Sequence, residues 1–197
     1  MILASGILGA PAVEVTFSGR HDWSGGSTST FTFSGVTFHG SAAVVLVFTG
    51  SGFTTSVTID GVAATEYRLG GSGLDSSLRW YVAATSAASG DVVITRSGST
   101  TVMRIYVWSL ADYDSLTPVD WNTAYDLTPP TSLSASVEEG GAILAGSYGT
   151  SGADISGVDT DGSGSSDVGG HKLITDTDAA YAVSHSANSY LGYISFR

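Results

Sequence analysis

Apolar residues recur at every second position along most of this chain. Val13, Val15 and Phe17 alternate with polar neighbours in 13–19, and Phe31 and Phe33 do the same in 29–35. A period of two residues sends successive side chains to opposite faces of a β-strand, whereas an amphipathic helix needs a period of about 3.6. Because no ten-residue stretch carries a capped helical pattern, the chain is predicted to be all-β.

The same alternation predicts strands throughout, separated by Gly- and Ser-rich turns. The predicted strands cover 13–19, 29–35, 42–48, 56–60, 62–69, 78–84, 90–97, 101–110, 132–138, 142–149, 171–176, 179–185 and 190–196. Asp60-Gly61 predicts a two-residue type I′ hairpin turn, because both residues tolerate a positive φ. The run AAVVLVF at 42–48 is apolar on both faces, which indicates a central strand covered on both sides.

Many short strands separated by Gly- and Ser-rich turns are typical of sandwiches and barrels. We therefore expect a single domain at 13–197, an antiparallel two-sheet β-sandwich that is jelly-roll-like, preceded by a short extended N-terminal arm at 1–12. Pro118, Pro129 and Pro130 lie within 111–131 and predict a long crossover without regular pairing. No internal repeat of fixed period is visible along the sequence.

Composition excludes several classes of function. The chain has 197 residues, of which 42% are apolar, so it can build a substantial core. Seven basic and eighteen acidic residues give a formal charge of -11, and Lys172 is the one lysine, so we expect no nucleic-acid partner.

No apolar run approaches the roughly 20 residues of a membrane-spanning helix, so we expect no membrane partner either. The apolar start lacks a positively charged segment, which argues against a secretory signal. Without cysteine, the chain has no disulfide, no thiolate metal site and no thiol nucleophile.

The segment VDTDGSGSSDVGG at 158–170 spaces oxygen atoms in the manner of a calcium loop. The candidate ligands are Asp159, Asp161, Ser163, Ser165 through its carbonyl group, and Asp167. Gly170 stands where a calcium loop has its bidentate glutamate, so any ion would be held weakly. We interpret the segment first as a connection between strands, and keep Ca²⁺ as a weaker alternative in a protein otherwise expected to need no cofactor.

Two groups of aromatic and polar residues are candidates for binding a glycan. They are Asp22 and Trp23, and Trp121, Asn122 and Tyr125. Sugar rings stack on tryptophan and tyrosine while Asp and Asn bind the hydroxyl groups. The alternative is that these aromatic rings close the ends of the sandwich or pack against a second subunit. Trp80 and Trp108 lie in predicted strands and are expected to be structural.

No catalytic motif stands out. The chain has no G-x-S-x-G elbow, no H-E-x-x-H and no phosphate loop, and its four histidines show no ligand spacing. We therefore expect a protein that is not an enzyme.

The order of the segments resembles that of a known group of proteins. AVVLVFTGSGFTTSVTIDGVAATEY, RWYVAATSAASGDVVITRSGSTTVMRIYVWSLADYDSLTPVD and SLSASVEEGGAILAGSY are followed by a closing alternating strand. This order resembles uncharacterised β-sandwich proteins of bacteriophages and prophages of alphaproteobacterial hosts. In that group SVTIGGVAAT precedes AxVPxGxSGDVVVTFSG, then xVxVWxLxG and TPVD. The resemblance covers roughly residues 28–196 and lies in the sequences of the strands and turns, not in catalytic residues.

The resemblance implies a virion protein, a capsid decoration, head-fibre or tail-associated component. Its partners would be phage capsid or tail proteins, and it would form a homo-oligomer or a multicopy array. The alternative is a host-glycan-binding, lectin-like module of a tail fibre or head spike. No separate anchoring domain is apparent, so the arm at 1–12 or one sheet face is expected to anchor the protein.

Overall fold

The computed structural model describes residues 12–49, 54–68, 78–126, 131–149, 154–186 and 189–197, and for residues 125, 126 and 189 it describes the backbone alone. The described residues form sixteen strands and no helix, so the predicted all-β fold is confirmed. Neighbouring strands pair antiparallel in every sheet. The arm expected at 1–12 lies outside the described residues except for Ala12.

The first half of the chain forms two sheets. Sheet A contains, in spatial order, β1 (Glu14–Asp22), β9 (Met103–Ala111), β3 (Ala42–Thr49), β7 (Leu78–Ala84) and β6 (Thr65–Tyr67). Sheet B contains β2 (Thr28–Thr37), β8 (Ser89–Thr100), β4 (Thr54–Ile59) and β5 (Val62–Ala63). Asp60 (φ 52°) and Gly61 (φ 76°) join β4 to β5, so the positive φ angles expected at this turn are confirmed.

The second half forms two more sheets. Sheet C contains β10 (Asp120–Asp126), β16 (Ser189–Phe196), β12 (Ala142–Gly149), β14 (Asp167–Leu173) and β13 (Asp159–Ser163). Sheet D contains β11 (Thr131–Val137) and β15 (Asp178–His185). The expectation of an unpaired crossover at 111–131 is wrong in part, because β10 pairs with β16 along its whole length. Pro118 precedes this strand and Pro129 follows it, so neither interrupts the pairing.

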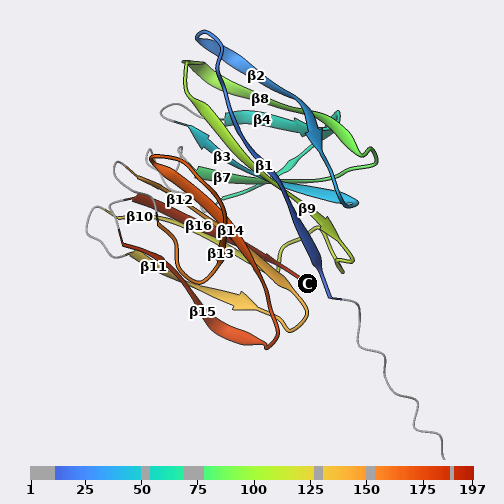
Figure 1. The fold of residues 1–197 in the computed structure, drawn as a ribbon, viewed down its shortest axis with the longest axis vertical. Helices are drawn as coiled ribbons and strands as arrows, with labels where there is room; N and C mark the ends of the chain where they lie inside the picture. Colours follow the sequence, from blue (N-terminus) through green and yellow to red (C-terminus); the bar gives the residue numbers. More distant parts are fainter. Residues whose placement is uncertain (1–11, 50–53, 69–77, 127–130, 150–153, 187–188) are drawn as a thin grey trace, which may run out of the picture.

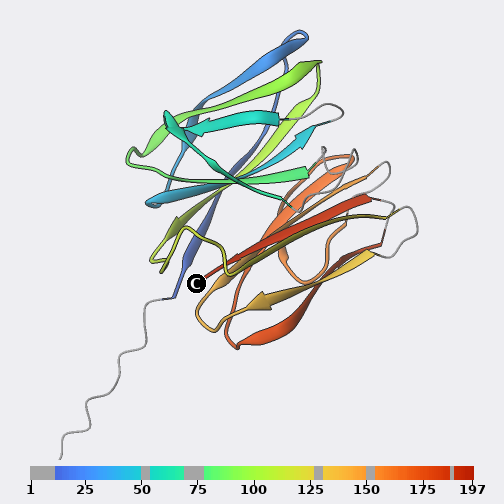
Figure 2. The same ribbon diagram turned by 180° about the vertical axis from the view of Figure 1, so that it is seen from behind.

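The four sheets are stacked in the order B, A, C, D, from top to bottom in Figure 1 and again from behind in Figure 2. Three apolar cores fill the three spaces between them. The sequence pattern predicted two sheets, whereas the described residues form four. Alternation fixes the two faces of a strand but does not indicate the number of sheets. Sheet A is covered on both faces, and all eight residues of β3 are buried, as predicted for 42–48.

The strand order of sheet A is repeated in sheet C. The order β1-β9-β3-β7-β6 becomes β10-β16-β12-β14-β13, and β2-β8 of sheet B becomes β11-β15 of sheet D. Ser156 bridges Ser184 of β15 in the place where β4 pairs with β8. The chain therefore contains two copies of one topology, packed back to back through sheets A and C, although no fixed period is visible in its sequence.

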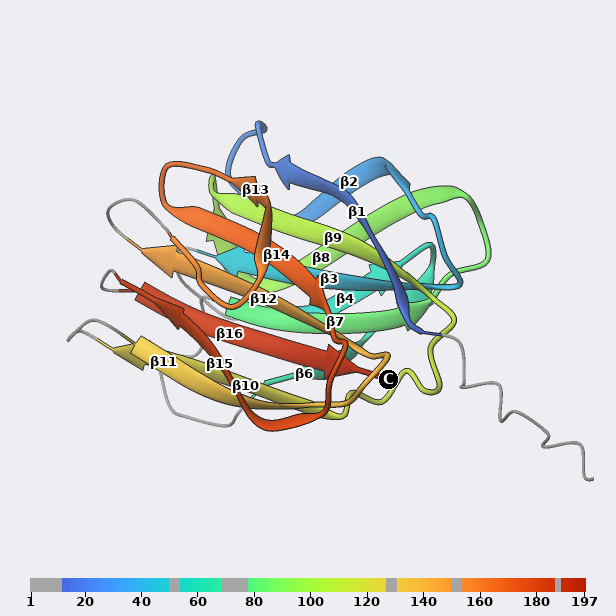
Figure 3. The ribbon, with the colours of Figure 1, turned by 60° about the horizontal axis from the view of Figure 1, so that its bottom comes forward.

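A row of glycines makes the contact between sheets A and C close. The row crosses four neighbouring strands of sheet C, three of which lie side by side in Figure 3 as β16, β12 and β14. Its members are Gly192, Gly146, Gly169 and Gly162. A Cβ atom on Gly169 would lie 2.6 Å from Cδ1 of Tyr106, and one on Gly146 would overlap Cδ2 of Leu46. Large side chains of sheet A thus occupy the space that side chains would fill in sheet C.

The two copies differ where they meet. Leu46 of β3 pairs with Trp80 and Tyr106 on its two sides. At the corresponding place in β12, Gly146 pairs with Gly169 and Gly192. The same three positions therefore carry large side chains in one copy and glycine in the other, which makes the two surfaces complementary.

Candidate functional site

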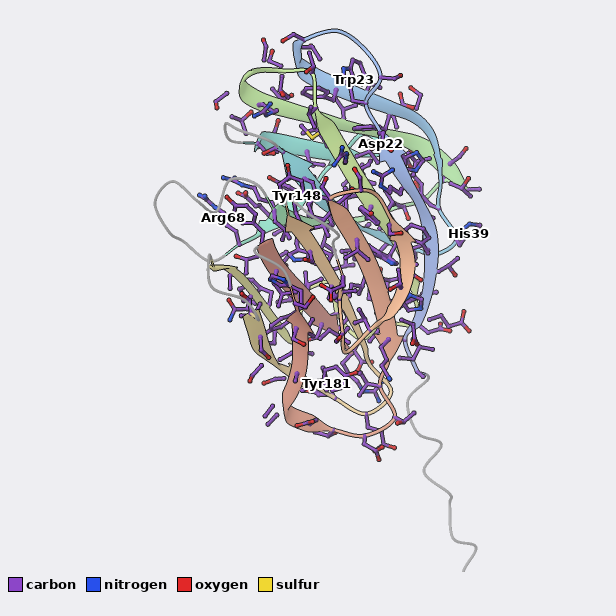
Figure 4. The ribbon with its side chains drawn as sticks, turned by 60° about the vertical axis from the view of Figure 1, so that its left-hand side comes forward. Asp22, Trp23, His39, Arg68, Tyr148 and Tyr181 are labelled. Carbon is purple, nitrogen blue, oxygen red and sulfur yellow. The ribbon has the colours of Figure 1, made fainter. Side chains whose placement is uncertain are left out.

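Asp22 and Trp23 lie together at the end of β1 (Figure 4). The half-buried ring of Trp23 meets Phe31 edge to face, with ring centroids 5.2 Å apart, so it packs against the core between sheets A and B. Asp22 is 48% exposed and forms ion pairs with Arg20 and Arg104. Both candidate residues thus have partners within the chain, and Asp22 keeps a solvent-exposed surface.

The second group of glycan candidates lies on β10 of sheet C. Trp121 is half-buried and packs edge to face against Tyr67, with ring centroids 5.2 Å apart, in the core between sheets A and C. Asn122 follows it on the strand and is also half-buried, and the side chain of Tyr125 lies outside the described residues. The structure therefore places Trp23 and Trp121 against different cores and does not combine them in one site.

The candidate calcium segment is a β-hairpin. Asp159 begins β13, Asp167 begins β14, and the backbone N–H of Gly164 donates to the carbonyl oxygen of Asp167 at 2.7 Å across the turn. Ser163 ends β13 and Ser165 lies in the turn, so the interpretation of 158–170 as a connection between strands is wrong, because most of the segment is itself two paired strands. Among the residues that the structure describes, no three His, Cys, Asp or Glu side chains are grouped to hold a metal ion.

Asp167 is instead the centre of an ion-pair network between the two halves of the chain. Its side chain is fully buried, and both of its oxygens lie 3.0 Å from Nη2 of Arg20, while Nη1 of Arg104 lies 3.5 Å away. Burial opposes the charge of Arg20, yet the hydrogen bond and charge of Asp167 raise the pKa of that guanidinium. The pKa of Tyr106 is raised by burial and then by the negative charge of Asp167. The network joins β1 and β9 to β14.

Asp161 makes a second polar connection between sheets A and C. Its Oδ2 accepts a hydrogen bond from Nε1 of Trp108 at 2.7 Å. Nδ1 of His171 lies 2.7 Å from the same oxygen and donates to it, because a carboxylate only accepts. Trp108 is fully buried, as expected for a structural tryptophan, and so is Trp80.

A third polar group occupies the interior at one end of the sandwich formed by sheets A and B. Arg79 is 3% exposed, and its Nη1 donates to Glu66 Oε1 at 2.5 Å and to the carbonyl oxygen of Thr54 at 3.2 Å. The hydroxyl of Tyr81 donates to the same Glu66 oxygen at 3.1 Å. Burial raises the pKa of Tyr81, and the charge of Glu66 raises it further. Arg96 lies opposite Thr54 in the strand register and is 4% exposed.

None of these arginines is among the site residues predicted from the sequence. Arg96 does continue the inward-facing series Val92 and Ile94 at the same period of two, which is the one signal that a buried arginine leaves in a sequence. The pairing of Arg20 with Asp167 joins residues 147 positions apart and leaves no local signal at all.

No family matches the chain, and neither a curated protein nor a solved structure matches it. Among the described residues, none belongs to a helix with the length and apolar character that crossing a membrane requires.

Proposed function

We propose that this protein is a non-enzymatic component of a phage virion, displayed on the particle surface as a capsid decoration or head-fibre protein. The observation that carries the proposal is the strand order of sheets A and B. The resemblance of residues 28–196 to phage and prophage β-sandwich proteins also supports the proposal.

We infer that sheets A and B form a jelly roll. β1, β9, β3 and β7 adjoin in sheet A, while β2, β8, β4 and β5 adjoin in sheet B. Successive strands thus cross repeatedly between the two sheets, as in the double-sheet jelly roll of two Greek keys. That architecture serves viral capsid proteins and lectins, so it supports a virion role and leaves glycan binding as the second candidate.

The mechanism is the burial of complementary surface in a symmetric, multicopy array. Four sheets with three continuous cores make a rigid body, because packed interiors resist deformation. Weak contacts to capsid or tail proteins, repeated in each copy, add up through multivalency. The net charge of -11 opposes nonspecific adsorption to DNA and to anionic cell surfaces.

Cryo-electron microscopy of phage particles carrying the tagged protein tests the proposal. The expected result is density for the four-layer body at repeated sites on the capsid or tail. A second sample, with residues 1–12 deleted, tests the arm as the anchor. The expected result is that this variant folds with an unchanged melting temperature and no longer co-purifies with particles. Particles that lack the full-length protein altogether would exclude a virion role.

The second candidate is a host-glycan-binding module, favoured by the exposed carboxylate of Asp22 beside Trp23 (Figure 4). A glycan array measures it directly. Trp23→Ala is expected to abolish glycan binding, whereas Trp121→Ala is expected to lower stability through the lost contact with Tyr67 and to leave binding intact. Absence of binding to any host polysaccharide would remove this candidate and leave the virion proposal standing.

A further inference from the structure

The interior of the sandwich between sheets A and B changes from apolar to polar at one end. Along β8, Val92, Ile94 and Arg96 face inward, and their register partners in β4 are Ile59, Val57 and Thr54. Among the residues that the structure describes, Arg96 and Thr54 are therefore the last inward-facing pair of sheet B.

Arg96 carries a buried charge that has no partner among the described residues. Its side chain is 4% exposed, and its Nε and Nη1 atoms are buried and make no hydrogen bond within the part of the chain that the structure describes. The hydroxyl of Thr54, on the adjacent strand, is also buried; it interacts with the hydroxyl of Tyr81 but makes no well-aligned hydrogen bond among the described residues. Across the interior, Glu66 is already bound by Arg79 and lies 3.6 Å from Nε of Arg68. The one acidic side chain in these contacts is thus shared by two other arginines.

An unpaired guanidinium in a protein interior is energetically costly. Burial lowers the pKa of Arg96, yet an arginine side chain stays protonated in proteins, so it cannot escape the cost by losing its charge. Buried charges are as a rule paired, and breaking such a pair typically costs several kcal/mol. A buried group without a partner therefore points to a bound ion or ligand that completes the site.

We propose that Arg96 and Thr54 form a binding site for a carboxylate at this end of the sandwich. The planar fork of a guanidinium matches the two oxygens of a carboxylate, and the hydroxyl of Thr54 adds one further donor. One unpaired positive charge balances one negative charge, which favours a monoanion over a phosphate dianion. The carboxylate comes either from a small organic acid or from an acidic sugar such as a uronic acid. This proposal does not depend on the virion role.

Thermal unfolding in a chloride-free, carboxylate-free buffer, with added sodium acetate, methyl glucuronide or methyl glucoside, tests the site. For the wild-type protein, acetate or the glucuronide is expected to raise Tm by roughly 3–6 °C at ten times its Kd, and the neutral glucoside to leave it unchanged. Saturation by acetate alone would identify a small organic acid, and tighter binding of the glucuronide an acidic sugar. Either result supports the proposal.

Arg96→Met separates this site from general salt effects. Because the variant removes an unpaired buried charge, it is expected to raise Tm in the carboxylate-free buffer and to abolish the rise with acetate. Arg68→Met, which removes an arginine that is 43% exposed, is the matched control and is expected to keep the rise. An acetate effect that survives in Arg96→Met would overturn the proposal.

A spectroscopic readout on the wild-type chain covers the case in which Arg96→Met fails to fold. In ¹H–¹⁵N NMR spectra, titration with acetate is expected to shift one arginine Nε–H signal. Arg96→Lys identifies that signal by its loss. Arginine signals that do not respond to acetate or glucuronide would overturn the proposal as well.

Discussion

Leu46 of β3 lies directly against the backbone of Gly146 of β12, so that a side chain at Gly146 would occupy the same space as Cδ2 of Leu46. The two residues hold corresponding positions in the two copies of the topology. Two sheets that both carried leucine here would not approach so closely. The difference between the copies therefore determines that sheet A packs on sheet C and not on a second sheet A.

Gly146→Ala is expected to destabilise the protein by about 1–3 kcal/mol, because it overpacks a core in which Leu46 has no exposed surface. Urea unfolding measures the effect. Leu46→Ala alone opens a cavity, and in the double variant the new methyl group fills part of it, so the two losses should sum to more than the loss in the double variant. Gly98→Ala is the control, since no atom lies within 4 Å of a Cβ at that position.

Asp167→Asn is expected to lower the free energy of unfolding by about 3 kcal/mol. The carboxylate is fully buried between Arg20 and Arg104, and its removal leaves two guanidinium groups with the exposed Asp22 as their one counter-charge among the described residues. Urea unfolding at two salt concentrations measures the change. Asp159→Asn, an exposed carboxylate on the same hairpin, should change stability by less than about 0.5 kcal/mol. Equal losses in the two variants would show that the network does not stabilise the fold.

Much of the fold could be predicted from residue order alone. The alternation in 13–19 and 29–35, the doubly apolar run at 42–48 and the turn at Asp60-Gly61 all correspond to observed elements. The number of layers could not be predicted, because a strand apolar on both faces indicates cover on both sides without indicating what provides it. β10 is not predicted by the sequence pattern, because prolines on both sides of it argue against regular pairing in 111–131, whereas the strand itself contains no proline.

The polar interior was harder to predict than the core. Asp159, Asp161 and Asp167 are close in sequence, which predicts a shared ion, but they lie on two antiparallel strands, and Asp161 and Asp167 bind different partners while Asp159 is exposed. Trp108, which binds Asp161, and the two arginines that bind Asp167 come from the distant β9 and β1, and contacts of that kind are set by how the sheets stack. Residue type alone indicates Trp23 and Trp121 as glycan candidates, and it does not distinguish a ring that packs against Phe31 or Tyr67 from a ring that binds a ligand.

Calcium at millimolar concentration is expected to leave the melting temperature unchanged within about 1 °C. An ion stabilises a protein only when it binds the folded state better than the unfolded state. Here the oxygens of Asp161 are engaged by Trp108 and His171, and those of Asp167 by arginines. Differential scanning calorimetry in calcium and in EGTA measures the shift. A rise in calcium that disappears in Asp159→Ala would mean that the hairpin rearranges to bind the ion.

We expect the free energy of unfolding to depend on pH through the half-buried His21. Burial lowers the pKa of His21 below its ordinary value of 6.5, against the opposing charge of Asp22, and its buried Nε2 atom has no hydrogen-bond partner among the described residues. At this histidine the unfolded chain therefore binds a proton more readily than the folded protein does. The stability that comes from keeping His21 neutral is present above about pH 6.5 and is lost as the pH falls below it.

Between pH 6.5 and 5, the free energy of unfolding is thus expected to decrease in the wild-type protein, by at most about 1.4 kcal/mol per pH unit for one proton. His21→Gln should flatten this dependence, whereas substitution of the exposed His39 by Gln should preserve it. Carboxylates contribute little in this range because they titrate mainly below it. Urea unfolding at closely spaced pH values measures the slopes, and identical slopes for His21→Gln and the wild-type protein would place the titrating group elsewhere.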